Sequence, residues 1–396
     1  MRILFCNYEY PPLGGGGAIV NRYLAKELAK EHEVTVLTSG GPDLPDDAVE
    51  DGVRVIRVPV FFRRQRFAAN LPSLFAYMVM GTIAGKKHLK SHQYDVISTI
   101  FVLPTGPVGN ALARFSGTPN VLTVIAGDIY DPSKFTSTHR HPILKAWAKK
   151  LIRRADKVIV NSKNVLGYMH RLYTPEIEGI QIPLGIERHP STAASREAYG
   201  FAEDETLLVT VGRLVSRKAL PKLIESMEAF RGEKVRLLIV GTGPQEQQLK
   251  EEIAARDLGA QVTLVGYVED EEKRSILKMC DIYTSTSQHE GFGLVFVEGM
   301  AAGLPVVCYD QGGQTDYLED QKTGYLVPLN DLDLFKERCR DLVKDKDKRY
   351  RMGQENLQRA EQLYIDSCAQ RYLNVFESAV NNAQSSPVAG TAEMAR

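Results

Sequence analysis

HEGFGLVFVEGMAAGLPVV, residues 289–307, contains a turn, a helix and a strand in that order. Glu290 precedes the Gly-Phe-Gly turn, and Glu298 stands inside the helix that the turn begins. The first N–H groups of a helix have no partner within the helix, so they attract phosphate. Carboxylates accept hydrogen bonds from paired hydroxyls, which ribose and hexoses both offer. The stretch is therefore suited to binding a sugar nucleotide.

Short β-rich runs alternate with amphipathic helical stretches along the whole chain, which predicts an α/β fold with parallel sheets. In the first half we expect a helix over Ala18–Lys30 and strands at Arg2–Asn7, Glu33–Thr38, Arg54–Val58, Asp95–Thr99, Val121–Val124 and Lys157–Val160. In the second half we expect helices over Lys218–Phe230 and Gln245–Arg256 and strands at Thr206–Val211, Val235–Val240, Gln261–Val265, Asp281–Ser285, Pro305–Tyr309 and Gly324–Val327.

These two series predict two Rossmann-like, doubly wound domains. Ligands of open α/β sheets bind beyond the carboxyl ends of the strands, so two such sheets that face each other would enclose a cleft. We expect the N-terminal domain over residues 1–185 and a second domain over residues 186–365. Residues 366–382 are expected to form a helix that crosses toward the N-terminal domain, and residues 383–396 a disordered tail.

The bulk properties are those of a soluble globular protein. The chain has 396 residues, of which 43% are hydrophobic and 25% charged, enough for two or three domains. Neither a transmembrane helix nor a signal peptide is predicted. The five cysteines are scattered without a Cys-x-x-Cys pair, which indicates reduced thiols of a cytoplasmic protein without a zinc site.

Charge is distributed unevenly, although the net charge is zero. Residues 1–185 hold 23 Lys and Arg against 15 Asp and Glu, a balance of +8, and the remainder holds 26 against 34, a balance of −8. Basic segments with aromatic residues lie at 61–67 and 145–154, the second with Trp147, Leu151 and Ile152 expected on the opposing face. Such segments suit anionic lipid headgroups. We hypothesise a peripheral membrane contact through the N-terminal domain; a solvated surface is the alternative, and no nucleic-acid module is visible.

A glycine-rich loop, LGGGGA at residues 13–18, follows the first strand and precedes a helix. Gly15, Gly16 and Gly17 let the backbone approach a ligand closely and direct N–H groups toward it. The loop matches neither the dinucleotide fingerprint nor a Walker loop. Such a loop is suited to binding a ligand; a merely flexible turn is the alternative.

Arg213 and Lys218 occur in VGRLVSRK, directly after the first strand of the second half. The end of a strand places them at the ligand edge of the sheet. A planar guanidinium and a compact ammonium together suit a diphosphate. Arg217 is expected to face solvent.

Asp128, in VIAGDIYD, follows the strand that ends near Val124. It is a candidate for a catalytic polar role near the reacting centre, with a structural turn as the alternative. Tyr130 and His139 in the following loop are candidates for acceptor binding, or else ordinary loop residues. No Asp-x-Asp metal motif is evident, so the sequence gives no dedicated divalent-ion site, and we predict neither a metal ion nor another cofactor.

The glutamate pair, the Gly-Phe-Gly turn and the AGLPVV that follows resemble the signature of the family 4 retaining glycosyltransferases. The resemblance covers nearly the whole chain, including Asp156–Ser162 and GTGP at 241–244, and it implies the two-domain GT-B fold. It further implies that Glu290 binds hydroxyls of the donor sugar and Glu298 those of the ribose. The remaining donor contacts that we expect are the pyrophosphate ligands Arg213 and Lys218, the glycine loop, Gly241, Gly291, Phe292, Gly293 and Leu294.

The chain also departs from the family pattern. Leu184 replaces a frequent Asn, Ala219 a frequent Gly and Gly299 a frequent Ala. Ile125 and Ala126 stand where many relatives have a histidine that contacts the sugar, so the resemblance provides no such contact here. None of these changes removes a predicted phosphate or hydroxyl ligand.

The predicted function is transfer of a hexose from a nucleotide-diphosphate sugar to a glycan or lipid-linked acceptor, with retention and without metal. Family frequency favours a UDP-sugar over a GDP-sugar, but no residue decides between them. Since no carboxylate nucleophile is evident, front-face attack is the hypothesis. The alternatives are a sugar-nucleotide 2-epimerase, whose pattern lacks this glutamate string, and a non-catalytic sugar-nucleotide-binding protein, which would be expected to lose Arg213 or Lys218.

Overall fold

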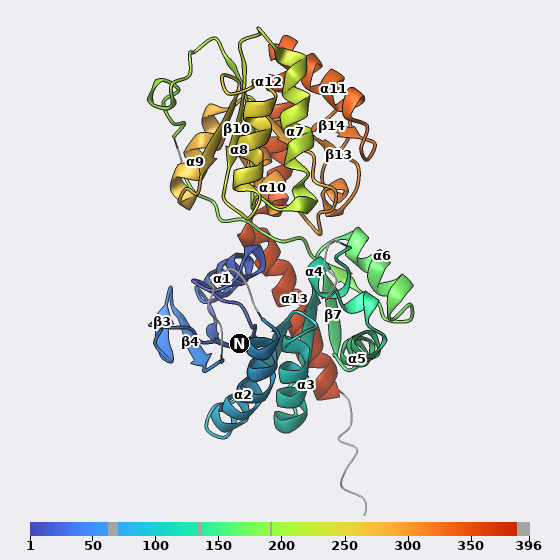
Figure 1. Cartoon of the computed structure of the whole chain (residues 1–396). Helices are drawn as coiled ribbons and strands as arrows, with labels where there is room; N and C mark the ends of the chain where they lie inside the picture. The colour runs from blue at the N-terminus through green and yellow to red at the C-terminus, as the bar shows by residue number, and fades with distance from the viewer. Residues whose placement is uncertain (62–69, 133–136, 191, 386–396) are drawn as a thin grey trace, which may run out of the picture. The chain divides into compact units, whose positions relative to one another are not determined.

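The chain divides into two compact units in the computed structural model, which describes residues 1–61, 70–132, 137–190 and 192–385 (Figure 1). Unit 1 comprises Met1–Glu187 together with the segment that begins at Ile365, and unit 2 comprises Arg188–Tyr364. The division expected after residue 185 lies within two residues of this one.

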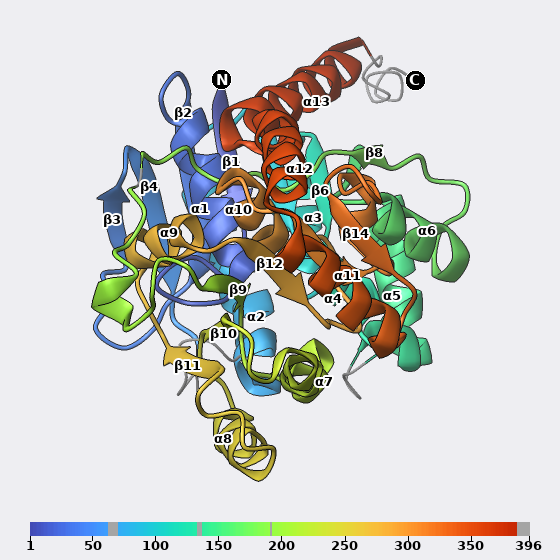
Figure 2. The ribbon, with the colours of Figure 1, turned by 90° about the horizontal axis from the view of Figure 1, so that it is seen from above.

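Unit 1 is built on a sheet whose described strands follow the order β3-β4-β2-β1-β5-β6-β7-β8. The strands are β1 (Arg2–Cys6), β2 (Glu33–Ser39), β3 (Asp47–Glu50), β4 (Val53–Val58), β5 (Val96–Ile100), β6 (Asn120–Val124), β7 (Lys157–Val160) and β8 (Ile180–Gln181). All pair in parallel except β3, which runs antiparallel to β4 at one edge (Figure 2). Neither β3 nor β8 was predicted, because both are short and lack the buried apolar run of a central strand.

Successive residues of a strand point to opposite faces of the sheet, so each face of unit 1 has its own core. On one face, Ile3 and Phe5 pack with α1 (Gly16–Leu28) and α13 (Ile365–Ser385). On the other face, Leu4 and Cys6 form a core with the helices on that side. The helices of this second layer are α2 (Leu71–Leu89), α3 (Thr105–Ser116), the short α4 (Ala126–Ile129), α5 (Pro142–Arg153) and α6 (Lys163–Leu172).

Unit 1 differs from the sequence-based expectations in some details. Helix α13 continues to Ser385, so the tail expected from residue 383 begins too early, and residues 386–396 lie outside the described part. On α5, Leu151 and Ile152 are buried, whereas Trp147 is 36% exposed and lines a groove together with Leu151. Residues 62–67 of the first basic segment lie outside the described residues.

Unit 2 is built on a parallel sheet in the order β11-β10-β9-β12-β13-β14 among its described strands. These strands are β9 (Thr206–Val211), β10 (Val235–Val240), β11 (Val262–Gly266), β12 (Ile282–Ser285), β13 (Val306–Tyr309) and β14 (Gly324–Val327). The chain builds outward from β9 through β10 to β11 and then returns to the other side of β9 with β12. The switch point between β9 and β12 is where open α/β sheets bind ligands.

The helices of unit 2 are α7 (Leu220–Ser226), α8 (Glu246–Ala255), α9 (Asp270–Met279), α10 (Leu294–Ala301), α11 (Leu332–Lys344) and α12 (Lys346–Ala360). The single helix expected over residues 218–230 is wrong. It is divided into η3 (Ser216–Lys218), α7 and η4 (Met227–Phe230), because Ala219 adopts a left-handed conformation, φ 46°, between η3 and α7.

Both units are therefore Rossmann-like α/β domains, as predicted. No described helix has the length and apolar character that crossing a membrane requires. All five cysteines are free thiols and are buried.

Candidate functional site

Glu290 lies at the switch point of unit 2, in the loop that follows β12. Its side chain is only 8% exposed, and it meets Lys218, which ends the turn after β9. Lys218 Nζ donates to Glu290 Oε1 at 2.6 Å, and Ser287 Oγ donates to the same oxygen at 2.7 Å. Arg217 Nη1 donates to Glu290 Oε2 at 3.3 Å and to the carbonyl of His289 at 3.0 Å. The structure thus brings two predicted site residues, Glu290 and Lys218, into direct contact.

The charge state of Glu290 follows from these neighbours. Burial by itself would raise the pKa of this carboxyl, but the positive charges of Lys218 and Arg217 lower its pKa to about 2. An ionised carboxylate only accepts hydrogen bonds, so Glu290 is prepared to receive hydroxyl donors at any physiological pH. Lys218 retains further N–H donors beyond the one that it gives to Glu290.

Arg217 was expected to face solvent, and this expectation is wrong. The 3₁₀ turn η3 directs its guanidinium back toward the carbonyl of His289 and the carboxylate of Glu290. Arg213, by contrast, is exposed, and its guanidinium forms no hydrogen bond or ion pair with a described residue. The sequence contains no signal for this difference, because the direction of each side chain depends on the turn between them.

The turn before α10 is held rigidly. The hydroxyl of Tyr317 donates to the carbonyls of Phe292 and Gly293 at 2.7 and 2.9 Å, and its ring packs against the buried ring of Phe292. Gly293 has φ 85°, and a Cβ there would lie 2.4 Å from the ring of Phe296. Leu294 is the first residue of α10, so the N–H groups at this helix end have no partner within the helix. Tyr317 is a supporting residue that sequence reasoning missed.

Glu298 projects from α10 toward α9. Its Oε1 accepts from Lys273 Nζ at 2.9 Å, and Lys273 also pairs with Asp270 at 2.9 Å. Burial would lower the pKa of Lys273, but these two carboxylates raise it above its usual value. Glu298 Oε2 is buried and has no hydrogen-bond partner among the described residues. An unpaired buried oxygen is costly, so this atom has capacity to accept a further hydrogen bond.

Glycine lets the neighbouring loops of unit 2 pack backbone against backbone. Gly241 has φ 133°, and a Cβ there would lie 2.1 Å from the carbonyl oxygen of Gly212. A Cβ on Gly313 would come equally close, 2.1 Å, to the carbonyl oxygen of Gly291. The N–H of Gly313 also donates to the carbonyl of Glu290 at 2.9 Å. These contacts set the positions of Gly241 and Gly291 at the edge of the sheet.

The glycine loop of unit 1 is shorter than predicted. Helix α1 begins at Gly16 and not at Ala18, so Gly16 and Gly17 are its first residues and Gly15 is its N-cap. The N–H of Gly15 donates to Glu9 Oε2 at 3.3 Å. A Cβ on Gly17 would lie 2.7 Å from the ring of Phe101. Three predicted donor-binding residues thus form the N-terminal end of a helix.

Asp128 lies on α4 and is buried. Its Oδ2 accepts from the backbone N–H groups of Val102 at 3.0 Å and Ile125 at 3.4 Å. The carboxylate therefore joins the loop after β5 to the end of β6, which is a positioning arrangement. Its catalytic role stays a prediction.

The two candidate acceptor residues of unit 1 contact each other. The ring of Tyr130 stacks on Tyr168 at 3.9 Å between centroids and lies 4.7 Å from the ring of His139. His139 Nδ1 is 2.8 Å from Ser137 Oγ. Burial and the neighbouring Arg140 lower the pKa of His139, which favours the neutral imidazole at neutral pH.

In the described part of the chain, no three His, Cys, Asp or Glu side chains are grouped as metal ligands.

Comparison with known proteins identifies the family. The family description "Glycosyl transferases group 1" matches residues 191–359, and "Glycosyltransferase Family 4" matches residues 14–188. The GDP-mannose-dependent alpha-(1-6)-phosphatidylinositol monomannoside mannosyltransferase of Mycolicibacterium smegmatis is 25% identical over 378 residues, 89% of this chain and 91% of that protein.

Two solved structures share the fold. Sucrose-phosphate synthase from Thermosynechococcus elongatus superposes with a TM-score of 0.84 at 24% identity, covering 96% of this chain and 100% of that one. Anabaena HepE in complex with UDP-glucose superposes with a TM-score of 0.74 at 21% identity and the same coverage.

Proposed function

We propose that this chain, which belongs to the family 4 glycosyltransferases, transfers a hexose from a nucleotide-diphosphate sugar to a glycan or lipid-linked acceptor with retention of configuration. That it is a glycosyltransferase acting on nucleotide sugars follows from the family. The finer parts of the proposal are supported mainly by the buried cluster of Glu290, Lys218 and Arg217 at the switch point of unit 2.

In this proposal, the cluster binds the reacting end of the donor. The ionised Glu290 accepts hydrogen bonds from sugar hydroxyls. Lys218 directs its remaining N–H donors to the diphosphate, and the exposed guanidinium of Arg213 reaches the same group. The N-terminal end of α10, held by Tyr317, adds backbone N–H donors. These donors stabilise the negative charge that develops on the departing diphosphate, so we propose that no metal ion is needed.

Glu298 binds the ribose. Lys273 holds Glu298 Oε1, which leaves Oε2 to accept from the ribose hydroxyls. The salt bridge thereby orients the carboxylate, and Lys273 acts as a positioning residue. This arrangement favours a nucleotide ligand over a free sugar phosphate.

Retention follows from front-face attack. Both oxygens of Glu290 are engaged by cations, and its low pKa makes it a weak nucleophile. We therefore propose that the acceptor hydroxyl attacks the anomeric carbon from the side of the departing diphosphate. The bond from that carbon to the phosphate oxygen breaks, and a diphosphate oxygen takes the proton of the acceptor.

The first donor to test is a UDP-sugar, because HepE, a structural neighbour, is known with UDP-glucose bound. A GDP-sugar is the second candidate, since the mycobacterial relative is GDP-mannose-dependent. The name of that relative also supports a lipid-linked acceptor. The buried free thiols suit a reducing compartment, so we place the activity in the cytoplasm, at the inner membrane face.

A thermal-shift screen of UDP-, GDP- and ADP-sugars identifies the donor, because selective binding stabilises the native state by mass action. Incubation of that donor with lipid-linked glycans, with and without EDTA, then tests transfer. We expect release of the nucleoside diphosphate and an unchanged anomeric configuration by NMR. Epimerised donor in the absence of acceptor would support the 2-epimerase, and binding without turnover would support the non-catalytic protein. A trapped covalent glycosyl-enzyme would overturn front-face attack.

A further inference from the structure

A row of large apolar side chains lies exposed along α2 of unit 1. The exposed fractions are 68% for Leu71, 65% for Phe75, 42% for Val79 and 58% for Ile83. Residues four apart in a helix stand on the same side, so these four form one stripe. The outward side of a helix in a soluble domain is normally polar. Burial of the opposite side, which includes Tyr77, shows that the row is not the face that packs on the sheet.

The helices around this row carry positive charge, and of their cations only Arg153 forms an ion pair with a described residue, Glu176, at 2.5 Å. Helix α2 packs beside α3, and α3 packs beside α5, in the same layer over the sheet. None of the three contains Asp or Glu. Their cations are Lys86, Lys87, Arg114, Lys145, Lys149, Lys150 and Arg153. These three helices thus contribute seven cations and no carboxylate to the half of the sequence that has an excess of eight positive charges.

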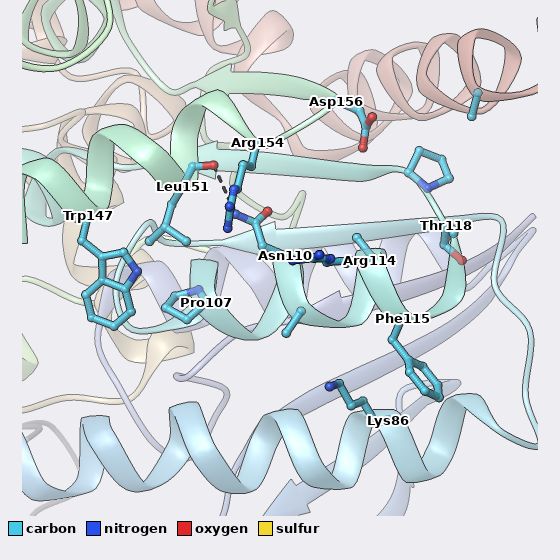
Figure 3. Close-up of a pocket in the computed structure, with 15 residues that line it drawn as sticks. Lys86, Pro107, Asn110, Arg114, Phe115, Thr118, Trp147, Leu151, Arg154 and Asp156 are labelled. Carbon is cyan, nitrogen blue, oxygen red and sulfur yellow. Dashed lines mark hydrogen bonds between the residues drawn. The ribbon is translucent and has the colours of Figure 1, made fainter. Parts of the chain in front are cut away.

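A groove of ≈ 990 Å³ opens in this layer and is lined mainly by α3 and α5. Figure 3 shows Arg114 and Arg154 between Trp147 on one side and Phe115 on the other. Neither guanidinium forms an ion pair with a described residue, and Lys86 Nζ lies over the ring of Phe115 at 5.7 Å. The groove therefore offers unpaired cations between exposed aromatic rings.

The groove lining also contains one carboxylate among the described residues, that of Asp156. Its Oδ2 accepts from the backbone N–H of Asn120 at 2.7 Å. This carboxylate is thus bonded to the backbone, and no ion pair joins it to either arginine. The lining keeps its positive balance and suits phosphate groups.

We propose that the outer faces of α2, α3 and α5, here called the basic apolar face, dock on an anionic lipid bilayer. The row of α2 enters the boundary between headgroups and acyl chains, and the cations contact lipid phosphates, with the groove receiving a headgroup. The positive charge of the basic apolar face favours an anionic bilayer as its partner. A second copy that docked through the same face would bring like charges together, whereas an anionic bilayer neutralises them. The inference is argued from unit 1 alone and agrees with the lipid-linked acceptor of the proposed function.

Vesicle binding tests the proposal directly. We expect the full chain to sediment with vesicles of phosphatidylcholine and phosphatidylglycerol but not with phosphatidylcholine alone. Added salt should weaken this binding, because exposed charges are screened. Trp147 is the single tryptophan of the sequence, so its fluorescence should shift to the blue when anionic vesicles are added. Absence of binding to the anionic vesicles would overturn the proposal.

Paired substitutions locate the surface. The double substitution Phe75→Ser and Ile83→Ser should weaken vesicle binding by about tenfold or more, since two exposed apolar side chains lose their lipid contact. Lys86→Gln and Arg114→Gln should each weaken it by about fivefold. The matched control is Val49→Ser, because Val49 is 74% exposed on β3 of the same unit. Equal loss in the control would overturn the assignment of this face.

The same variants separate this inference from the proposed enzymatic function. Their melting temperatures, nucleotide binding and transfer to a soluble glycan acceptor should match those of the original chain, because none of the substituted residues lies in the donor site. Loss of transfer to the soluble glycan would contradict this separation. If analytical ultracentrifugation instead showed a dimer that Phe75→Ser and Ile83→Ser dissolve, a second copy would cover the face and the membrane proposal would fail.

Discussion

Glu290 is a buried carboxylate whose two oxygens are bound by Lys218, Ser287 and Arg217. This carboxylate stays ionised, accepts hydrogen bonds and pairs with two cations. A neutral amide in the same position keeps the shape but loses the charge that holds both cations. The consequences for turnover and for stability differ, and each can be measured.

For turnover, we predict that Glu290→Gln and Arg213→Ala each lower kcat/KM on the identified donor by about 100- to 1,000-fold, because each removes a partner of the reacting donor. Steady-state release of nucleoside diphosphate measures the effect. Arg351→Ala is the matched control, since Arg351 is also an exposed arginine of unit 2. Near-normal turnover in both site variants would contradict the assigned site.

For stability, the lowered pKa of Glu290 predicts a specific dependence on pH. The folded-state pKa, about 2, lies below the ordinary value of 4.5. Its stabilising contribution is therefore present above pH 4.5 and is lost as the pH falls toward 2. The contribution is roughly 3 kcal/mol at neutral pH. Denaturant titrations should show a steeper loss of unfolding free energy over this range for the original chain than for Glu290→Gln; parallel curves would contradict the buried ion pair.

Ala219 separates η3 from α7, and at the scale of elements it is a strained point. Its φ of 46° is a left-handed conformation that costs alanine about 1 kcal/mol or more. We predict that Ala219→Gly stabilises unit 2 by about 0.5 kcal/mol, because relief of strain exceeds the added entropy of the unfolded chain. Ala254→Gly, in the last turn of α8, is the control and should destabilise by about 0.5 kcal/mol. Thermal unfolding should show a higher melting temperature for Ala219→Gly and a lower one for Ala254→Gly.

Tyr317 connects two elements, since its hydroxyl binds the carbonyls that precede α10. We predict that Tyr317→Phe weakens nucleoside diphosphate binding by about five- to tenfold, because the helix end that we propose as the phosphate site loses its support. Isothermal titration calorimetry measures the dissociation constant. Phe292→Leu, which removes the ring partner but keeps both hydrogen bonds, should have a smaller effect. An unchanged affinity in Tyr317→Phe would mean that the turn is held by other contacts.

At the scale of the whole molecule, the stability of unit 1 depends on helix α13, which follows unit 2 in the sequence. It returns from the end of unit 2 and buries Tyr372, Val375 and Phe376 on the unit 1 sheet. Each such side chain contributes about 1.5–3 kcal/mol, so their combined loss is comparable to the whole stability of a domain. We predict that truncation after Tyr364 unfolds unit 1, whereas truncation after Ser385 leaves melting temperature and activity unchanged. Circular dichroism and turnover of the two truncated chains test this, and a stable shorter chain would contradict the role of α13.

The sequence alone determined the fold class, because alternating strands and amphipathic helices are local patterns. The turn, helix and strand of residues 289–307 appear as predicted, with Glu290 before α10 and Glu298 within it. The same local patterns failed at residues 218–230, where a left-handed Ala219 interrupts the expected helix. They also missed β3, a short edge strand that pairs with β4.

The tertiary structure decided which side chains meet. Lys218 and Glu290 are 72 residues apart, and Lys273 and Glu298 are 25 apart, so no spacing in the sequence announces either pair. Arg217 turned inward because of the direction of η3, and Tyr317 reached α10 from a distant loop. The exposed row on α2 became visible only when the opposite side of that helix was buried. Periodicity is a property of neighbours along the chain, whereas contacts, burial and pKa depend on neighbours in space.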